Sequence, residues 1–316
     1  MMQDGEIAFG PGEEFRFIRR LIRRLGPLAV GIGDDAALLH VPRDNMVAIS
    51  TDTSSENVHF RRDWLTLEQI GYRATTAALS DLAAMGASGA GILVALSTLR
   101  EARADLDLLA DGIARAVTAA GVKVYGGDTT IGDNLSLTVT VFGNVRDPMR
   151  RDAARAGHHV YLTGVLGGPG AAVAALTAGS EAAPGWLERF ANPRARIREG
   201  RWLAGRGARA AIDISDGLVA DAAHLAAASD VCIAIDIGRV PRVSGTTAVA
   251  AARSGEEYEL LLTSAIPIDC DGFSQRFGIP LTEIGNVVDG APGVTVTLDG
   301  EPVTEELGGF DHFRNR

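Results

Sequence analysis

The chain has 316 residues, of which 46% are hydrophobic and 22% are charged, a composition typical of a globular protein with a buried core. Its formal net charge of −10 argues against a general nucleic-acid surface, because phosphate backbones are bound by clustered lysines and arginines. No stretch has the length and character of a membrane span or a signal peptide, and only two cysteines are present. We therefore expect a soluble cytoplasmic protein of one large or two ordinary domains.

The first half of the chain alternates predicted helices and strands. Hydrophobic periodicity predicts a helix over residues 13–25, strands near 28–30 and 47–50, a long helix from 66 to about 85, a strand over 92–99, a helix over 104–120, and strands over 122–125 and 135–142. Thr66 and Gln69 have the spacing of a capping box at the start of the long helix. Gly86 ends that helix.

A polar stretch around residues 146–155, which contains Pro148, marks the predicted boundary between domains at 1–147 and 148–316. The second part contains predicted strands at 160–163, 210–214, 231–237, 258–263, 281–288 and 294–298. An Ala-rich helix follows the first of these strands, a further helix starts at Asn192-Pro193 with asparagine as its cap, and another covers 218–228. The alternation predicts a mixed α/β protein in two halves.

Acidic residues recur beside glycine, serine and threonine, where the pattern predicts the ends of strands or helices. They are Asp34-Asp35, Asp52, Asp128, and Asp213 with Asp216, and Asp81 lies inside the long helix. Any one of them is more simply explained as a cap or turn residue. Clustered carboxylates, however, need positive charge between them, and Mg²⁺ prefers oxygen ligands. The repetition therefore indicates a site for Mg²⁺ and a phosphorylated ligand.

Residues 164–170 form a glycine-rich loop between a predicted strand and a predicted helix. Such a loop can cradle phosphate at a helix N-terminus, but the Gly-Lys-Ser/Thr ending of a P-loop is absent. A plain strand-to-helix turn is the simpler interpretation. Neither a Gly-x-Ser-x-Gly elbow nor a His-Glu-x-x-His zinc motif occurs, and among the histidines only His59 lies near an acidic cluster.

Seven short blocks spread over nearly the whole chain carry a family resemblance. They are Gly-Ile-Gly-Asp-Asp-Ala (31–36), Ser-Thr-Asp-Thr (50–53) with Val-His-Phe (58–60), Leu-Ser-Asp-Leu-Ala-Ala-Met-Gly-Ala (79–87), Gly-Gly-Asp-Thr-Thr (126–130), Ile-Asp-Ile-Ser-Asp-Gly-Leu (212–218), Glu-Tyr-Glu-Leu-Leu (257–261) and Phe-Asp-His-Phe (310–313). In order and spacing these blocks resemble the thiamine-monophosphate kinase family, in the superfamily of aminoimidazole ribonucleotide synthetase.

The resemblance implies a two-domain fold like that of aminoimidazole ribonucleotide synthetase. Residues 1–147 would bind ATP and Mg²⁺, and their sheet would form a barrel-like interface in a homodimer. Residues 148–316 would complete the nucleotide and substrate site. The implied reaction is direct, in-line transfer of the γ-phosphate of ATP to thiamine monophosphate, with ATP as co-substrate and several Mg²⁺ ions.

The resemblance also implies roles for single residues. Implied Mg²⁺ ligands are Asp35, Ser50, Thr51, Asp52, Asp81, Asp128, Asp213 and Asp216. Implied ATP contacts are Gly127, Asp128, Arg151 and Ser215, and implied thiamine-substrate contacts are His59, Glu256 and Phe310. Of these, Asp52, Asp128 and Asp216 would act directly in the transfer.

The chain departs from the family mainly at its substrate end. Ser254 stands where the family commonly has glycine, so we expect a backbone angle there that suits glycine better. Glu257 stands where aspartate is common, and Asn57 replaces a usual glycine. Ala78 replaces a usual asparagine, and Ile131 replaces a usual arginine. Two alternatives stay open: another ATP-dependent phosphoryl transfer within the superfamily, and a nucleotide-binding descendant without catalysis.

Overall fold

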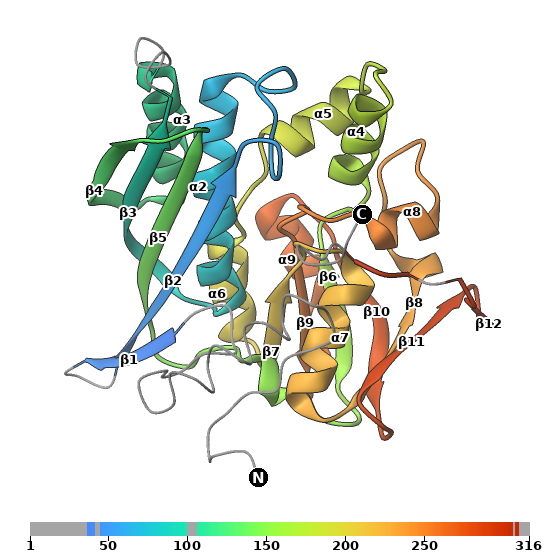
Figure 1. Cartoon of the computed structure of the whole chain (residues 1–316). Helices are drawn as coiled ribbons and strands as arrows, with labels where there is room; N and C mark the ends of the chain where they lie inside the picture. The colour runs from blue at the N-terminus through green and yellow to red at the C-terminus, as the bar shows by residue number, and fades with distance from the viewer. Residues whose placement is uncertain (1–36, 42–44, 100–105, 306, 310–316) are drawn as a thin grey trace.

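The computed structural model describes residues 37–41, 45–99, 106–305 and 307–309. The predicted helix over 13–25, the strand over 28–30, Asp35 and Phe310 lie outside the described residues. The described chain forms two α/β halves, each built on one sheet (Figure 1). Within those ranges, no helix is both long enough and apolar enough to cross a membrane.

The first half is built on a five-stranded sheet in the order β1-β2-β5-β3-β4. Its strands are β1 (Ala37–Val41), β2 (Asn45–Ser55), β3 (Ser88–Thr98), β4 (Lys123–Ile131) and β5 (Ser136–Val145). Neighbouring strands are antiparallel except for β3 and β4, which run parallel. Along β5, Leu137, Val139 and Val141 are fully buried and alternate with partly exposed residues, as their spacing predicts.

The helix α2 (Leu67–Ala84) lies between the two halves (Figure 1). It starts with the predicted capping box, because Thr66 Oγ1 accepts a hydrogen bond from the Gln69 N–H at 3.2 Å while Gln69 Oε1 accepts one from the Thr66 N–H at 2.9 Å. One side of α2 packs on β2 and β5, and another meets the second half at β7 (Ala208–Asp213) and α6 (Ile197–Ala204). Leu79 and Leu82 therefore share one core cluster with Tyr161 of the second half.

A second helix of the first half, α3 (Leu106–Ala120), crosses α2 at close range. A Cβ atom added to Gly71 would lie 2.2 Å from the Leu109 carbonyl oxygen, and one added to Gly112 would lie 1.9 Å from the Glu68 carbonyl oxygen. Both distances are far below van der Waals contact. The two glycines are therefore required for the helices to approach this closely.

The second half is built on a seven-stranded sheet in the order β12-β11-β8-β10-β6-β9-β7. Besides β7, its strands are β6 (His159–Thr163), β8 (Cys232–Asp236), β9 (Leu260–Ser264), β10 (Leu281–Val288), β11 (Gly293–Leu298) and β12 (Glu301–Pro302). Besides α6, its helices are α4 (Gly168–Thr177), α5 (Pro184–Ala191), α7 (Leu218–Ser229), α8 (Ala248–Arg253) and α9 (Cys270–Phe277), with short 3₁₀ turns η3 (Arg151–Ala153) and η4 (Ile237–Arg239). Only β8 and β11 pair in parallel.

The structure corrects one predicted helix start. Asn192 ends α5 rather than opening the next helix, because its N–H donates to the Glu188 carbonyl at 2.8 Å. The following Pro193 disfavours helical geometry at the residue before it, and α6 begins only at Ile197.

Neither sheet closes on itself within the described chain. The first sheet ends at β1 and β4, and the second ends at β12 and β7. A barrel-like interface would need a second copy of the chain, and it is not confirmed here.

Candidate functional site

Predicted site residues from both halves meet near the buried Tyr258. The pKa of its hydroxyl is raised well above the ordinary value, first by burial and then by Glu256, Asp52 and Asp213, whereas Arg73 lowers it. Coulombic interactions weaken with distance, so these four charged groups lie within electrostatic reach of the Tyr258 hydroxyl. Asp52 comes from β2, Arg73 from α2 and Asp213 from the end of β7. The site is therefore assembled where the two halves join.

The run of residues 50–52 is divided between the two faces of the first sheet. Ser50 Oγ donates to Asp81 Oδ2 at 2.5 Å, so its side chain faces α2. Side chains alternate along a strand, which places Asp52 on that face and Thr51 on the other. The Thr51 hydroxyl lies 3.0 Å from the Thr140 hydroxyl of β5. The side chains of Ser50, Asp52 and Asp81 therefore share one face, and that of Thr51 does not join them.

The loop of residues 214–217, between β7 and α7, is organised by a carboxylate that the sequence analysis did not identify. Asp221 Oδ2 accepts hydrogen bonds from the N–H groups of Ser215, Asp216 and Gly217, each at 3.1 Å. Burial, followed by Asp216 and Asp213, raises the pKa of Asp221, while Arg151 lowers it. Arg151 thus lies within electrostatic reach of Asp221, and its contact with ATP stays a prediction. The position of Asp221 in the first turn of α7, where helices favour acidic residues, was the available clue.

The structure does not bring Asp128 to the other carboxylates. Asp52 and Asp128 lie inside β2 and β4, so the prediction that they follow strand ends is wrong. Asp52 is in register with Gly127 of β4, and the strands β5 and β3 lie between them. At about 4.8 Å per strand, the backbones at these two residues are about 14 Å apart. Asp128 is the next residue along β4. Among the residues whose positions are described, no three His, Cys, Asp or Glu side chains are arranged to hold a metal ion.

The loop of residues 254–258, which contains the predicted substrate residue Glu256, is hydrogen-bonded to the 214–217 loop. The N–H of Glu256 donates to the Ser215 carbonyl at 2.7 Å, and those of Glu257 and Tyr258 donate to the Ile214 carbonyl at 3.1 and 2.9 Å. Glu256 and Tyr258 have φ values of 58° and 53°, a left-handed conformation that is uncommon for these residue types. The predicted nucleotide residue Ser215 and substrate residue Glu256 therefore belong to one connected unit.

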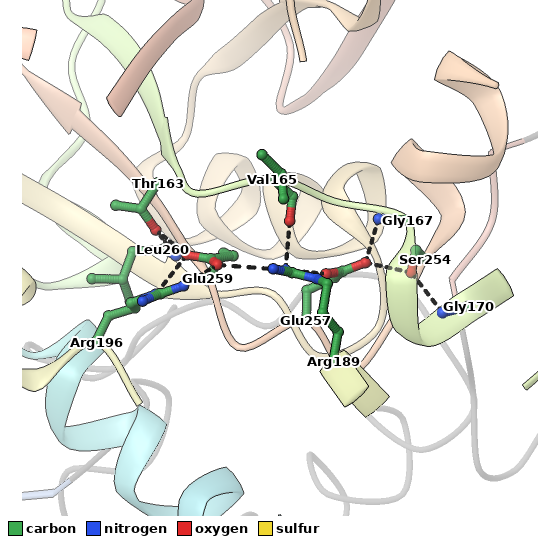
Figure 2. Close-up of polar contacts among 10 residues, drawn as sticks. All are labelled: Thr163, Val165, Gly167, Gly170, Arg189, Arg196, Ser254, Glu257, Glu259 and Leu260. Carbon is green, nitrogen blue, oxygen red and sulfur yellow. Dashed lines mark hydrogen bonds and ion pairs between the residues drawn. The ribbon is translucent and has the colours of Figure 1, made fainter. Parts of the chain in front are cut away.

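Ser254 does not have the unusual backbone angle expected where the family has glycine, since its φ is −67°. Its hydroxyl instead donates to Glu257 Oε1 at 2.6 Å and accepts a hydrogen bond from the Gly170 N–H at 2.9 Å (Figure 2). Two of the departures from the family, Ser254 and Glu257, thus contact each other. Their hydrogen bonds connect the 254–258 loop to the start of α4.

The glycine-rich loop before α4 binds a carboxylate of the protein itself. Glu257 Oε1 accepts a hydrogen bond from the Gly167 N–H at 2.5 Å, and Glu257 Oε2 lies 3.1 Å from Arg189 Nη2 (Figure 2). Burial raises the pKa of Glu257 to about 7, although Arg189, Ser254 and the Gly167 N–H act in the opposite direction. The loop is therefore an internally capped strand-to-helix turn, which was the simpler interpretation of its sequence.

A second buried carboxylate, Glu259, pairs with an arginine beside this turn. Glu259 Oε2 accepts hydrogen bonds from Arg196 Nε and from the Thr163 hydroxyl, each at 2.8 Å (Figure 2). A buried carboxylate requires such partners. Glu257 and Glu259 thus hold the start of β9 in place, on either side of Tyr258.

His59 lies in the turn that follows β2. Its Nδ1 accepts a hydrogen bond from the Ser55 N–H at 3.1 Å, which places the proton of a neutral ring on Nε2. Asn57 in the same turn has a φ of 66°. Asparagine tolerates this left-handed region better than most residues, so this replacement of a usual glycine keeps the turn.

The chain matches the AIR synthase related protein family, with its N-terminal domain over residues 33–145 and its C-terminal domain over residues 155–297. It is 35% identical to a thiamine-monophosphate kinase of Escherichia coli (strain K12), over 95% of this chain and 98% of that protein. A solved structure described as AaThiL complexed with AMPPCP and TMP has a TM-score of 0.83 and 29% identity, covering 96% of this chain and 97% of its own. The crystal structure of thiamine-monophosphate kinase from Stenotrophomonas maltophilia K279a has a TM-score of 0.74 and 32% identity, covering 92% and 98%.

Proposed function

This chain belongs to the thiamine-monophosphate kinases among the AIR synthase related proteins, and we propose that it transfers the γ-phosphate of ATP to thiamine monophosphate, forming thiamine diphosphate and ADP. One observation carries the proposal. The 214–217 and 254–258 loops are joined by hydrogen bonds, and Asp52 and Asp213 lie within electrostatic reach of Tyr258 in the second loop. A relative solved with AMPPCP and TMP supports a nucleotide and a thiamine phosphate as the two ligands.

The chemistry needs positioning more than proton transfer. Both reactants are polyanions, so catalysis rests on holding them in line and on neutralising their charge. The acceptor is a phosphate oxygen whose second pKa is about 6, so it is already largely deprotonated at neutral pH without a general base. The Glu256 carboxylate can attract the thiazolium cation, and the Nε2–H of His59 can donate to a polar group of the substrate.

We assign Mg²⁺ to five oxygen donors where β2, α2 and the 214–217 loop come together. They are Ser50, Asp52, Asp81, Asp213 and Asp216. Hard cations take such ligands. After burial, the nearby charges of Asp216 and Asp213 also raise the pKa of Asp221, and a cation would offset such like charges. When bound, Mg²⁺ would neutralise phosphate charge. Asp35, Thr51 and Asp128 stay predicted ligands, although the Thr51 side chain points to the other face of the sheet.

We also propose that the protein is a homodimer joined through the first sheet. Every residue of β4 is exposed, and Leu93, Val124, Tyr125 and Ile131 are large apolar residues exposed on β3 and β4. An uncovered apolar edge of this kind favours pairing with another chain.

We further propose that the two domains divide at 147/148. The matched regions, which end at residue 145 and resume at residue 155, support this division. The free thiols of Cys232 and Cys270 support a reducing cytoplasm.

The proposed function is tested by ADP release from Mg-ATP in the presence of thiamine monophosphate, of thiamine, or of no acceptor. We expect release only with thiamine monophosphate, and thiamine diphosphate as the product. ATP binding without release would indicate a non-catalytic descendant. Release that depends on a different phosphorylated acceptor would indicate another phosphoryl transfer of the superfamily.

A further inference from the structure

Arg73 extends a buried charge from α2 of the first half into the second half. Its Nη1 donates to the Phe190 carbonyl at 2.7 Å, and its guanidinium carbon lies 4.3 Å from the centre of the Phe190 ring. Its Nη2 forms an ion pair with Glu256 Oε1. The Arg73 side chain is only 4% exposed, whereas that of Glu256 is 27% exposed. The pair therefore has a fixed inner member and an outer member that a ligand can reach.

The surroundings of Arg73 fix its direction. A buried guanidinium must be paired to offset its lost hydration, and the Phe190 carbonyl and the Glu256 carboxylate both contact this one. Stacking on the aromatic ring further restricts the guanidinium plane. Arg73 is thus a rigid support rather than a mobile surface charge.

The backbone conformation of Glu256 also requires support from its surroundings. Its φ of 58° is sparsely populated for a residue with a side chain, and such strain persists only where the surroundings impose it. The hydrogen bond from its N–H to the Ser215 carbonyl holds the backbone, and the ion pair with Arg73 holds the carboxylate. Backbone and side chain are therefore fixed by different halves of the protein.

We propose that Arg73 is a positioning residue, which holds the Glu256 carboxylate at the substrate end of the site and thereby sets the affinity for the thiamine substrate rather than for ATP. This inference rests on the proposed function, in which Glu256 meets the substrate. The effect is specific because Arg73 holds the side chain of Glu256, whereas Asp221 and main-chain hydrogen bonds hold the 214–217 loop.

The test is a double-mutant cycle with R73M, E256Q and the double variant. We expect R73M to raise KM for thiamine monophosphate by about tenfold, the usual effect of one charge-assisted hydrogen bond, while KM for ATP changes less than about twofold. R73K, which keeps the charge but not the stacked, two-pronged guanidinium, should recover only part of the loss. In the E256Q background, R73M should add almost nothing, because residues that act through one interaction are not additive. Independent effects of R73M and E256Q, or equal rises in both KM values, would overturn the proposal.

The matched control is R196M, which removes another buried arginine from its glutamate, Glu259. This variant should lower thermal stability without a selective rise in KM for thiamine monophosphate. R73Q, which can still donate to the Phe190 carbonyl, replaces R73M in the cycle if R73M does not fold.

The wild-type chain is assayed first, so that a failure of the proposed function can be told apart from a failure of the role proposed for Arg73. Absence of ADP release with thiamine monophosphate overturns the proposed function, and amide hydrogen exchange then decides the role of Arg73. R73M should speed exchange at residues 256–258 more than R196M does, because the ion pair with Arg73 anchors that loop. Unchanged exchange there would overturn the assignment.

Discussion

Glu257 is a single residue whose burial ties protein stability to pH. Burial raises its pKa from the ordinary 4.5 to about 7, so between these values the folded protein binds more protons than the unfolded chain. The stabilisation from this difference is complete below pH 4.5 and is lost as pH rises through about 7. The total change is about 3 kcal/mol.

E257Q removes this titration, because an amide does not ionise in that range. We expect the free energy of unfolding of the wild type, relative to E257Q, to fall by about 3 kcal/mol between pH 4.5 and pH 8. Denaturant unfolding at several pH values measures this difference. E181Q, at an exposed glutamate, should leave the wild-type pH dependence unchanged. Parallel pH curves for wild type and E257Q would show that Glu257 does not titrate in this window.

Asp52 is the residue at which the metal assignment is most directly tested. D52N keeps the size of the side chain and removes its charge, so turnover should fall by about two to three orders of magnitude, as when one preorganised electrostatic group is lost from a site. Thermal unfolding should be nearly unchanged. D107N, at an exposed position on α3, serves as the control. A D52N enzyme with near-wild-type rates at saturating Mg²⁺ would contradict the assignment of Asp52.

At the scale of elements, the crossing of α2 and α3 depends on Gly112. A methyl group there would overlap the Glu68 carbonyl, 1.9 Å away, so G112A should destabilise the protein by about 1–3 kcal/mol through overpacking. G185A provides the matched control in α5, because a Cβ at Gly185 meets no atom within 4 Å. That change should be neutral or stabilising by up to about 1 kcal/mol. Equal unfolding free energies for the two variants would contradict the close crossing.

The sequence predicted an element well where the hydrogen bonds that define it join residues close together in the chain. The capping box of Thr66 and Gln69 identified the start of α2 because its hydrogen bonds span only three residues. The strand β2, in contrast, was predicted only over its apolar part. Its polar continuation pairs hydroxyls across the sheet, such as Thr53 with Thr138 at 2.8 Å, and a single strand does not reveal such a partner.

The same limit applies to the candidate site. Asp52 and Asp213 were identified from the recurrence of acidic residues beside glycine, serine and threonine, and both lie within electrostatic reach of Tyr258. Arg73 and Asp221 look like ordinary helix residues in the sequence, because their importance comes from partners such as Glu256 that are distant in the chain. For residues on strands, such as Thr51 and Asp52, sheet register decides what surrounds each side chain, and register is a tertiary property.

At the scale of the whole molecule, the proposed dimer would be joined through the open sheet of the first half. Tyr125 on β4 is 65% exposed, and its ring lies 5.4 Å from that of Phe142. This aromatic pair therefore adds apolar surface beside the row of exposed residues on β3 and β4. Large aromatic side chains of this kind dominate the energetics of protein interfaces.

Y125E would bring a charge into the proposed interface, where a carboxylate without a partner is strongly disfavoured. We expect the dimer to weaken by at least about a hundredfold, equivalent to about 3 kcal/mol, so that light scattering at micromolar concentration reports a monomer. I266E is the matched control, because Ile266 is 58% exposed in the second half, between β9 and α9. This variant should remain dimeric. A monomeric wild type, or a Y125E protein as dimeric as I266E, would place any association of this chain on another surface.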